Sequence, residues 1–342
     1  MDRILECVPN FSEGRNIDSI NQIADAISSV KDVRLLHIDS GQAANRTVIT
    51  FAGDPDAVVE AAFLGAKKAT EVIDMTKHTG EHPRFGALDV CPLVPVSGIS
   101  MEETIAYARK LGKRMGEELG IHVYSYGYAA FTKKRENLAF CRSGEYEGLK
   151  AKLARRDGKP DFGPVEFNAR SGASAVGARD FLIAYNVNLD TTSVAVAKTI
   201  AGEVREKGKT VEEKDEHGKA KYIPGTLKAV KAIGWYIEEF GFAQVSMNLT
   251  NIHITPLHIA FDEVCKKALE YGIKVTGSEI VGMVPMESMI EAGTYFLQKQ
   301  NLPVNVSDNE KIAVAIKSLG LDQLYKFKPE EKILEWVLKK RD

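Results

Sequence analysis

The sequence of 342 residues predicts an α+β fold, an α/β sandwich made of two similar halves. Two observations predict this class. Short apolar runs with the length of strands alternate with segments whose apolar residues recur every three or four positions, as they do on one face of a helix. The resulting order, strand–helix–strand–strand–helix–strand, then occurs a second time along the chain. Two halves, each with sheet and helices packed around a core, follow from this order.

In the first half, strands are predicted where apolar, β-branched runs end at Gly, Pro or Asp. A polar turn over residues 10–16 follows the first strand. Pro92 and Pro95 indicate that the fourth strand is an edge or exit strand, because proline cannot donate a hydrogen bond to a neighbouring strand. The predicted strands are residues 4–8, 33–38, 46–51, 87–96 and 123–128, and the predicted helices are residues 17–27, 55–72, 100–119 and 147–156.

The second half shows the same order, and the boundary is predicted at residue 178, which gives halves of residues 1–178 and 179–342. This order is the ferredoxin-like split arrangement. Residues 208–224 carry many charges and few apolar residues, so they are expected to form a surface loop. The predicted strands are residues 181–189, 227–238, 243–250 and 273–280, and the predicted helices are residues 193–207, 256–271, 285–298, 311–317 and 330–339.

Composition excludes several classes of protein. The formal net charge is −2, with acidic and basic residues mixed along the chain, so the basic stripe of a nucleic-acid-binding protein is absent from the sequence. The first residues do not form a signal peptide, and no apolar run reaches the length of a membrane span. The four cysteines include no Cys-x-x-Cys pair; Cys7, Cys91 and Cys265 lie in apolar runs and are expected to be buried free thiols. The cytoplasm is the expected location.

A polar loop with titratable groups runs over residues 78–91 and leads into an apolar strand, a common position for catalytic groups. Its His-x-x-Glu-His pattern, His78 to His82, occurs in some zinc peptidases. That chemistry needs both histidines on one helical face, whereas Gly80 weakens a helix and Pro83 disfavours helical backbone at His82. No metal site is therefore expected.

Two other patterns leave alternatives open. Residues 172–177 have glycines at P-loop spacing, but Ala178 stands where the phosphate-binding lysine would be. The surrounding segment, residues 161–177, is rich in Gly, Pro, Ser and Asn, so it could line a ligand cleft between the halves or simply connect them.

Charged residues near strand ends are candidates for an acidic substrate. Arg46 and Arg84 could bind carboxylates through paired hydrogen bonds, although most arginines are solvated surface groups. Asp39 and Asp89 could orient an imidazole or accept a hydrogen bond from an amino-substituted heterocycle, or they could cap turns.

A set of short motifs is distributed along the chain. They are ECVPNFSEG (6–14), NRTV (45–48), IDM (73–75), His78, GEHPR (80–84), GALDVCP (86–92), PDFGP (160–164), GAR (177–179) and AIGWY (232–236). Taken together, these stretches resemble one family, the formiminotransferase part of formimidoyltransferase-cyclodeaminase. The resemblance extends from Met1 to about Lys339, and no part of the chain is left for a cyclodeaminase domain, so a stand-alone transferase is expected.

The resemblance implies a fold, an activity and a site. The family has two ferredoxin-like halves that face each other across a charged tunnel, and it transfers the formimino group of N-formimino-L-glutamate to tetrahydrofolate. His82 matches the catalytic residue. In such a site Arg46 and Arg84 are candidates to bind the two carboxylates of the donor, and Asp39 is a candidate to orient His82 or the pterin. The folate-binding stretch corresponds to Gly163, Pro164, Val165, Glu166, Phe167, Asn168, Ala169, Arg170, Ser171 and Gly172.

Within that stretch Gly163, Pro164, Phe167 and Gly172 match the family pattern, and the other six residues depart from it. The family implies a homodimer, and a separate cyclodeaminase chain is a possible partner. In the implied reaction the N5 amine attacks the amidine carbon, and an imidazole that titrates near neutral pH moves the proton from N5 to the departing glutamate nitrogen.

Three alternatives remain. The donor could be N-formylglutamate or formiminoglycine, because the attacking and leaving atoms are equivalent. The chain could be a metal-dependent hydrolase based on the His-x-x-Glu-His pattern. It could also bind folate without turnover.

Overall fold

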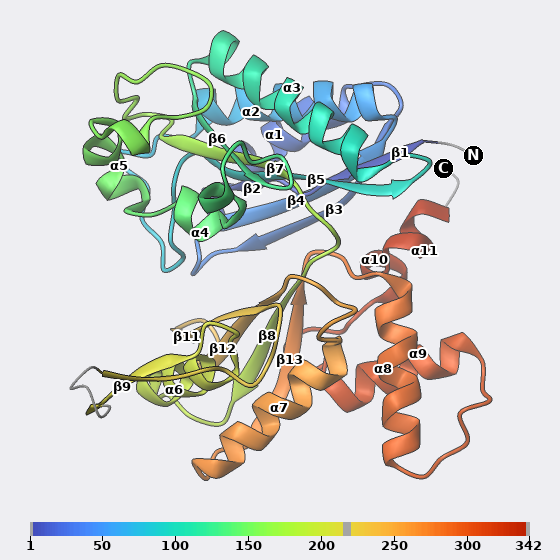
Figure 1. The fold of residues 1–342 in the computed structure, drawn as a ribbon. Coiled ribbons are helices and arrows are strands. Elements are labelled where there is room, and N and C mark those ends of the chain that lie inside the picture. Colours follow the sequence, from blue (N-terminus) through green and yellow to red (C-terminus); the bar gives the residue numbers. More distant parts are fainter. Residues whose placement is uncertain (1–2, 215–219, 340–342) are drawn as a thin grey trace. The chain divides into compact units, whose positions relative to one another are not determined.

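The computed structural model describes residues 3–214 and 220–339, which belong to two units, Met1–Asp180 and Phe181–Asp342 (Figure 1). Each unit combines one main β-sheet with several helices, so the α+β class is confirmed. None of the helices in the described ranges is long and apolar enough to span a membrane.

The first unit contains a seven-stranded sheet in the order β3, β4, β1 and β2, β5, β7, β6, where β1 and β2 lie one after the other between β4 and β5. The strands β5, β7 and β6 are parallel, whereas the other pairs are antiparallel. The strand bounds are β1 Ile4–Cys7, β2 Asn10–Phe11, β3 Val33–Gly41, β4 Arg46–Gly53, β5 Leu88–Ser97, β6 His122–Gly127 and β7 Ala173–Ala178.

Three long helices, α1 Ile17–Ser28, α2 Pro55–Val72 and α3 Met101–Leu119, cover one face of this sheet (Figure 1). Each begins at a residue whose side chain accepts a hydrogen bond from the first turn, namely Asn16, Asp54 and Ser100, because the first backbone N–H groups of a helix have no partner within it. Two shorter helices, α4 Leu138–Cys141 and α5 Glu145–Leu153, contribute to a second cluster with residues of β6 and β7.

The two faces of the first sheet differ in polarity. On the face covered by α1–α3, alternate residues such as Ile49 and Phe51 belong to the apolar core. Asp39, Val48 and Asn10 lie opposite one another on neighbouring strands, so they share the other face. Arg46 precedes Val48 by two positions and lies on the same polar face.

The second unit contains a four-stranded antiparallel sheet in the order β11, β12, β8, β13, and β9 and β10 form a separate pair. The strand bounds are β8 Ile183–Leu189, β9 Lys209–Lys214, β10 Ala220–Ile223, β11 Val230–Ile237, β12 Phe242–Leu249 and β13 Val275–Val281. The helices are α6 Val194–Val204, α7 Leu257–Glu270, α8 Met286–Lys299, α9 Asp308–Leu319, α10 Pro329–Lys332 and α11 Leu334–Lys339.

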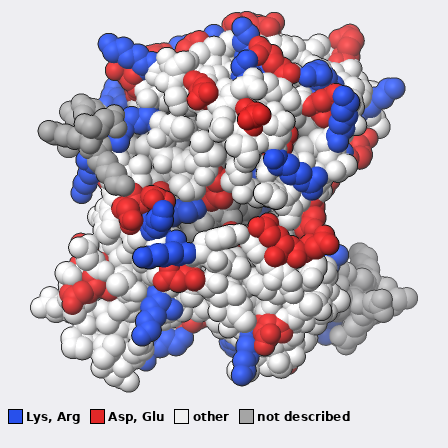
Figure 2. All heavy atoms as spheres, turned by 180° about the vertical axis from the view of Figure 1, so that it is seen from behind, with Lys and Arg blue, Asp and Glu red and all other residues white. Residues whose placement is uncertain are grey.

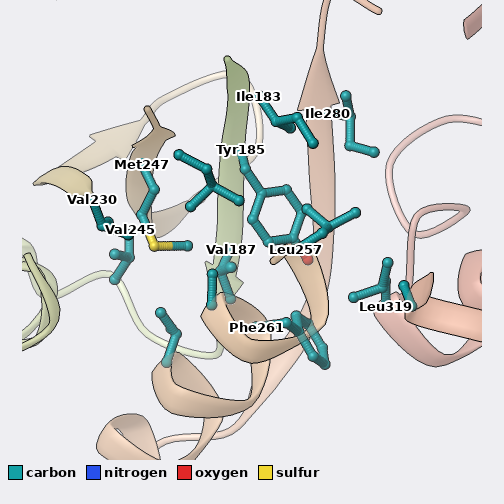
Figure 3. Packing of buried hydrophobic residues seen from close by; sticks show 14 of the residues in the cluster. Ile183, Tyr185, Val187, Val230, Val245, Met247, Leu257, Phe261, Ile280 and Leu319 are labelled. Carbon is teal, nitrogen blue, oxygen red and sulfur yellow. The ribbon is translucent and has the colours of Figure 1, made fainter. Parts of the chain in front are cut away.

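Side chains from the sheet and from α7 interdigitate in the core of the second unit (Figure 3). Tyr185 of β8 is fully buried among them. Its hydroxyl donates to Ser278 Oγ at 2.8 Å, and that hydroxyl donates in turn to the Leu319 carbonyl at 2.6 Å. The buried phenol is therefore satisfied, as a polar group in an apolar core must be.

Most predicted helices and strands are confirmed within a few residues, but one strand was missed and three predictions are wrong. The missed strand is β7, a buried strand between β5 and β6 that begins in the last part of residues 161–177. The strand with Pro92 is not an edge strand, since β5 lies between β1 and β7; the Pro92 carbonyl still accepts from Val8 N. Part of the expected loop at 208–224 forms β9 and β10, while residues 215–219 lie outside the described ranges. The predicted turn at 10–16 contains β2.

Three cysteines are buried, Cys7, Cys91 and Cys141, and Cys265 is half-buried. The prediction of buried free thiols is therefore confirmed for Cys7 and Cys91 and only approximate for Cys265. The sulfur atoms of Cys7 and Cys91 lie 3.6 Å apart in the core of the first unit.

Two helical glycines give a direct test of packing in the fold. Helix α8 packs closely on α9, and a Cβ atom at Gly293 would overlap the Lys311 carbonyl. Gly293→Ala should therefore lower the free energy of unfolding by about 1–3 kcal/mol. Gly148→Ala is the control, because Gly148 of α5 has no atom within 4 Å of the added Cβ and alanine favours a helix. Urea unfolding followed by circular dichroism should show a lower midpoint for Gly293→Ala alone; equal midpoints would contradict the close packing.

Candidate active site around His82

The loop that carries His82 connects α2 to β5 and is irregular, as Gly80 and Pro83 predicted. Its backbone is held by the turn between β3 and β4. Asn45 Nδ2 donates to the Thr79 carbonyl at 2.8 Å, and Glu81 N donates to the Ala43 carbonyl at 3.2 Å. A Cβ atom at Gly80 would lie 2.5 Å from the Ala44 carbonyl, so only glycine allows this approach.

His78 is part of this support. It is buried, and its Nε2 donates to the Asn45 carbonyl at 2.9 Å. The His-x-x-Glu-His segment is not helical, so His78 and His82 are not on one helical face as the zinc pattern requires. Among residues 3–214 and 220–339, no group of three or more His, Cys, Asp or Glu side chains could hold a metal ion.

A buried carboxylate at the site forms ion pairs with two arginines. Asp89 of β5 is 0% exposed and forms ion pairs with Arg46, at the start of β4, and with Arg142, just after α4. The Arg142 pair has an Nη2–Oδ2 distance of 2.8 Å. Arg46 Nε also donates to Asn10 Oδ1 of β2 at 3.1 Å. Three strands and one helix end therefore meet at this cluster.

His82 joins the cluster through the Pro83 carbonyl. His82 Nδ1 lies 2.7 Å from this oxygen, and Arg142 Nη2 donates to the same oxygen at 2.6 Å. A carbonyl oxygen can only accept, so Nδ1 carries the hydrogen and the lone pair of the neutral imidazole is on Nε2. The backbone thus selects the tautomer that can act as a base through Nε2.

The charge state of His82 differs from the expectation of titration near neutral pH. Burial of the ring is the largest cause, and the positive charges of Arg46 and Arg142 add to it, so that the pKa of His82 falls to about 3. Asp89 acts in the opposite direction but does not compensate. The ring is therefore neutral at physiological pH, and the sequence could not show this because Arg142 is distant along the chain.

Residues 163–172 lie next to the His82 loop. His122, fully buried on β6, donates from Nδ1 to the Pro164 carbonyl at 2.7 Å and accepts at Nε2 from Asn168 N at 3.0 Å. At the other end, Ala87 N donates to the Ser171 carbonyl at 2.9 Å, and Gly172 forms a bridge with Gly86. The stretch predicted to bind folate and the loop with His82 are thus joined by backbone hydrogen bonds.

Tyr146 links the two segments through its side chain. Its hydroxyl donates to the Ala169 carbonyl at 2.6 Å, and its ring lies 6.0 Å from the Phe167 ring. The Arg84 guanidinium lies over the Tyr146 ring, 5.3 Å from the ring centre, and forms an ion pair with Glu147 at 2.6 Å. Arg84 therefore faces residues 163–172, whereas Arg46 is in the cluster with His82.

The ten residues predicted to contact folate are not equally placed for it. Val165 and Glu166 are exposed. Arg170 donates to the carbonyls of Thr70 and Glu71 near the end of α2, at 3.3 and 2.8 Å. The remaining members, Gly163, Pro164, Phe167, Asn168, Ala169, Ser171 and Gly172, are half-buried or buried.

The structure also places the predicted acidic residues. Asp39 lies on β3, half-buried on the same sheet face as Arg46. The Asp89 carboxylate acts to raise the pKa of His82, and the role predicted for Asp39 stays a prediction. The sequence analysis missed Arg142 and Asn10: Arg142 follows a short helix in a region without a recognisable pattern, and Asn10 lies in a segment predicted to be a turn.

Comparison with known proteins is consistent with these motifs. The N-terminal subdomain of the formiminotransferase domain matches residues 4–179, and the formiminotransferase domain matches residues 184–339. The chain belongs to the formiminotransferase family.

Similar proteins of the family include both long and short chains. The formimidoyltransferase-cyclodeaminase of Sus scrofa is 45% identical over 338 residues, which are 99% of this chain and 60% of that protein. The chain thus spans about 60% of the length of these relatives. The glutamate formimidoyltransferases of Thermoplasma acidophilum and Streptococcus pyogenes are 46% and 40% identical, cover 86% and 88% of this chain, and are themselves covered to 92% and 95%.

Among solved structures, a microcompartment protein from Desulfitobacterium hafniense aligns over 82% of this chain with 11% identity and a TM-score of 0.21, which is too low to support an argument about fold or function. The surface adds one observation. On the described part of the face drawn in Figure 2, Lys and Arg lie among Asp and Glu rather than forming one basic stripe, as the net charge of −2 suggests.

The neutral state of His82 can be measured directly. A pKa of about 3 predicts that the ring signals of His82 do not shift between pH 5 and pH 8 in NMR spectra of the full chain, because the protonated form is unpopulated there. The His82→Ala spectrum assigns the signal. A titration midpoint near the ordinary value of about 6.5 would contradict the described electrostatics.

Proposed function

We propose that this chain is a glutamate formimidoyltransferase that moves the formimino group of N-formimino-L-glutamate to tetrahydrofolate and releases L-glutamate. Its membership of the formiminotransferase family and the stand-alone relatives of that name support the activity. The observation that carries the mechanism is the contact between His82 Nδ1 and the Pro83 carbonyl, beside Arg46 and Arg142.

The proposed reaction needs one group that takes a proton and then returns it. As the N5 amine bonds to the amidine carbon, N5 loses a proton, and neutral His82 can take it through Nε2. The imidazolium formed between two arginines is a strong acid, so it readily protonates the departing glutamate nitrogen. General acid–base catalysis of this kind contributes roughly 10²–10⁴-fold.

Tetrahydrofolate is the proposed co-substrate, held by residues 163–172. Phe167 of this stretch and the neighbouring Tyr146 form an aromatic pair that suits a flat heterocycle, because aromatic rings favour stacked or tilted contact. For Val165, Glu166 and Arg170, the proposed contact with tetrahydrofolate is based on the family resemblance alone. No step of the proposed reaction requires a metal.

The donor carries two carboxylates, and Arg46 and Arg84 are the proposed partners. Arg46 lies beside His82, where the reacting carbon must also lie. Arg84 lies against Tyr146 and is already paired with Glu147. Asp39 is proposed to orient the pterin from the polar face of the sheet.

The organisation of the chain is proposed on the same basis. Residues 1–178 would form the N-terminal subdomain with the catalytic loop, and residues 179–342 the C-terminal subdomain. In both units the strand order supports a duplicated ferredoxin-like arrangement. A tunnel between the halves, a homodimer, a separate cyclodeaminase partner and a cytoplasmic location remain predictions from the resemblance.

N-Formylglutamate and formiminoglycine remain the alternative donors, since the chemistry at the transferred carbon is shared. The metal-dependent hydrolase is not supported, because the segment from His78 to His82 is not helical and His78 Nε2 contacts a backbone carbonyl.

Removal of the imidazole tests the mechanism. His82→Ala should lower kcat for formation of the N5-substituted folate by roughly 10²–10⁴-fold, while calorimetry shows nearly unchanged tetrahydrofolate binding. His253→Ala is the control, since that imidazole is 77% exposed. Turnover of His82→Ala close to the wild-type rate would exclude His82 as the proton carrier.

The proposed folate stretch can be tested at a glycine. Gly172 has φ +65°, and an added Cβ would lie 2.6 Å from the Phe85 carbonyl, so Gly172→Ala should displace the stretch. Misplacement of this kind can reduce transfer up to roughly 100-fold. Gly120→Ala is matched, because Gly120 has φ +63° but nothing within 4 Å. If both variants bind tetrahydrofolate equally well, residues 163–172 are not the folate site.

A further inference from the structure

The cluster around Asp89 carries one positive charge in excess. Arg46 and Arg142 both contact the same carboxylate, and arginine stays protonated in proteins. The other groups that they contact, the Asn10 amide and the Pro83 carbonyl, are neutral. Among the contacts of these two arginines, two positive charges therefore meet one negative charge.

The excess charge lies in a mostly desolvated place. The side chains of Arg46 and Arg142 are 11% and 17% exposed, and Asp89 is 0% exposed. Charges act more strongly on a bound ion where water is scarce. A buried excess charge of this kind is costly unless another anion balances it.

The hydrogen bonds of the two guanidinium groups leave one end of each available. Arg46 uses Nε for Asn10 and Nη1 for Asp89, and Arg142 uses Nη2 for both Pro83 and Asp89. Nη2 of Arg46 and Nη1 of Arg142 donate to no other residue in the described ranges. Terminal guanidinium nitrogens are well suited to a planar carboxylate.

Arg84 differs in this respect. Its charge is balanced by Glu147, and its guanidinium lies over the Tyr146 ring. An anion that binds at Arg84 competes with Glu147, whereas one that binds at Arg46 and Arg142 meets uncompensated charge.

We propose that Arg46 and Arg142 together form a subsite for one carboxylate of the donor, beside His82, and that Asp89 sets the strength of this subsite. The proposal rests on the proposed function for the identity of the donor, but the subsite itself requires only a carboxylate. It makes Arg142, which no sequence motif indicates, a specificity-determining residue.

The subsite also connects donor binding to proton transfer. Arg46 and Arg142 oppose a positive charge on His82. A carboxylate between them cancels the excess charge, so the imidazolium that forms during transfer is less unfavourable when the donor is bound. His82 then accepts a proton more readily with the donor carboxylate bound than without it.

The test uses two substitutions that both break the Asp89–Arg142 ion pair but change the charge in opposite directions. Arg142→Gln removes the excess charge, and Asp89→Asn increases it. With saturating tetrahydrofolate, the KM for N-formimino-L-glutamate and the inhibition constant of L-glutamate should rise roughly 10- to 100-fold in Arg142→Gln. Both constants should be unchanged or lower in Asp89→Asn, and the KM for tetrahydrofolate should change in neither variant.

Two further variants separate binding from folding. Arg142→Lys keeps the charge and should recover much of the donor affinity. Arg114→Gln removes an arginine of α3 that forms ion pairs with Glu60 of α2 and with Glu118 of α3. This variant should leave donor affinity unchanged. If Arg142→Gln and Asp89→Asn raise the donor KM alike, the ion pair is only structural and the proposal is overturned.

Calorimetric titration of L-glutamate into the protein, without tetrahydrofolate, measures binding at the subsite without any transfer reaction. It therefore tests the subsite separately from the proposed function. Should the wild type give no transfer product, the reaction is wrong, yet L-glutamate binding that is lost in Arg142→Gln and kept in Arg114→Gln still supports the subsite. Absence of L-glutamate binding to the wild type, or equal binding to Arg142→Gln, overturns the subsite.

Discussion

The candidate site depends on one buried carboxylate. Asp89 of β5 holds Arg46 at the start of β4 and Arg142 at the end of α4, so a strand neighbour and a distant helix end are brought to one point. Arg142 then reaches the carbonyl of Pro83, which also receives Nδ1–H of His82. The position and tautomer of the imidazole follow from these contacts, and its neutral state follows from burial together with the charges of the two arginines.

A buried ion cluster of this kind contributes little to the stability of the folded state. Burying charges costs solvation energy, and replacing a buried ion pair with apolar residues is often neutral or stabilising, whereas removing one partner typically costs roughly 3–5 kcal/mol. A cluster with uneven charge is harder still to explain as a stabilising element. Its position beside His82, on the polar face of the sheet, is consistent with a role in binding an anion.

The sequence predicted much of the fold because hydrophobic spacing is local information. Most helices and strands lie where the spacing placed them, with bounds that differ by a few residues. It failed at β7, which consists mainly of small residues, with one glycine, and gave no strand pattern although the strand is fully buried. Pro92 also misled the prediction. Proline has no backbone N–H to donate, yet its carbonyl in β5 still accepts a hydrogen bond from Val8 N, and the strand has neighbours on both sides.

Prediction of the site was divided in the same way. His82, Arg46 and Arg84 lie in short motifs and could be named from the sequence. Arg142 could not, because its role arises only from the fold, and the low pKa of His82 follows partly from Arg142. The central claim is that the Pro83 carbonyl holds His82 with its hydrogen on Nδ1. The ¹⁵N chemical shifts of the two ring nitrogens at neutral pH test it most directly: a protonated Nδ1 and an unprotonated Nε2 are predicted, and a hydrogen on Nε2 would contradict the account.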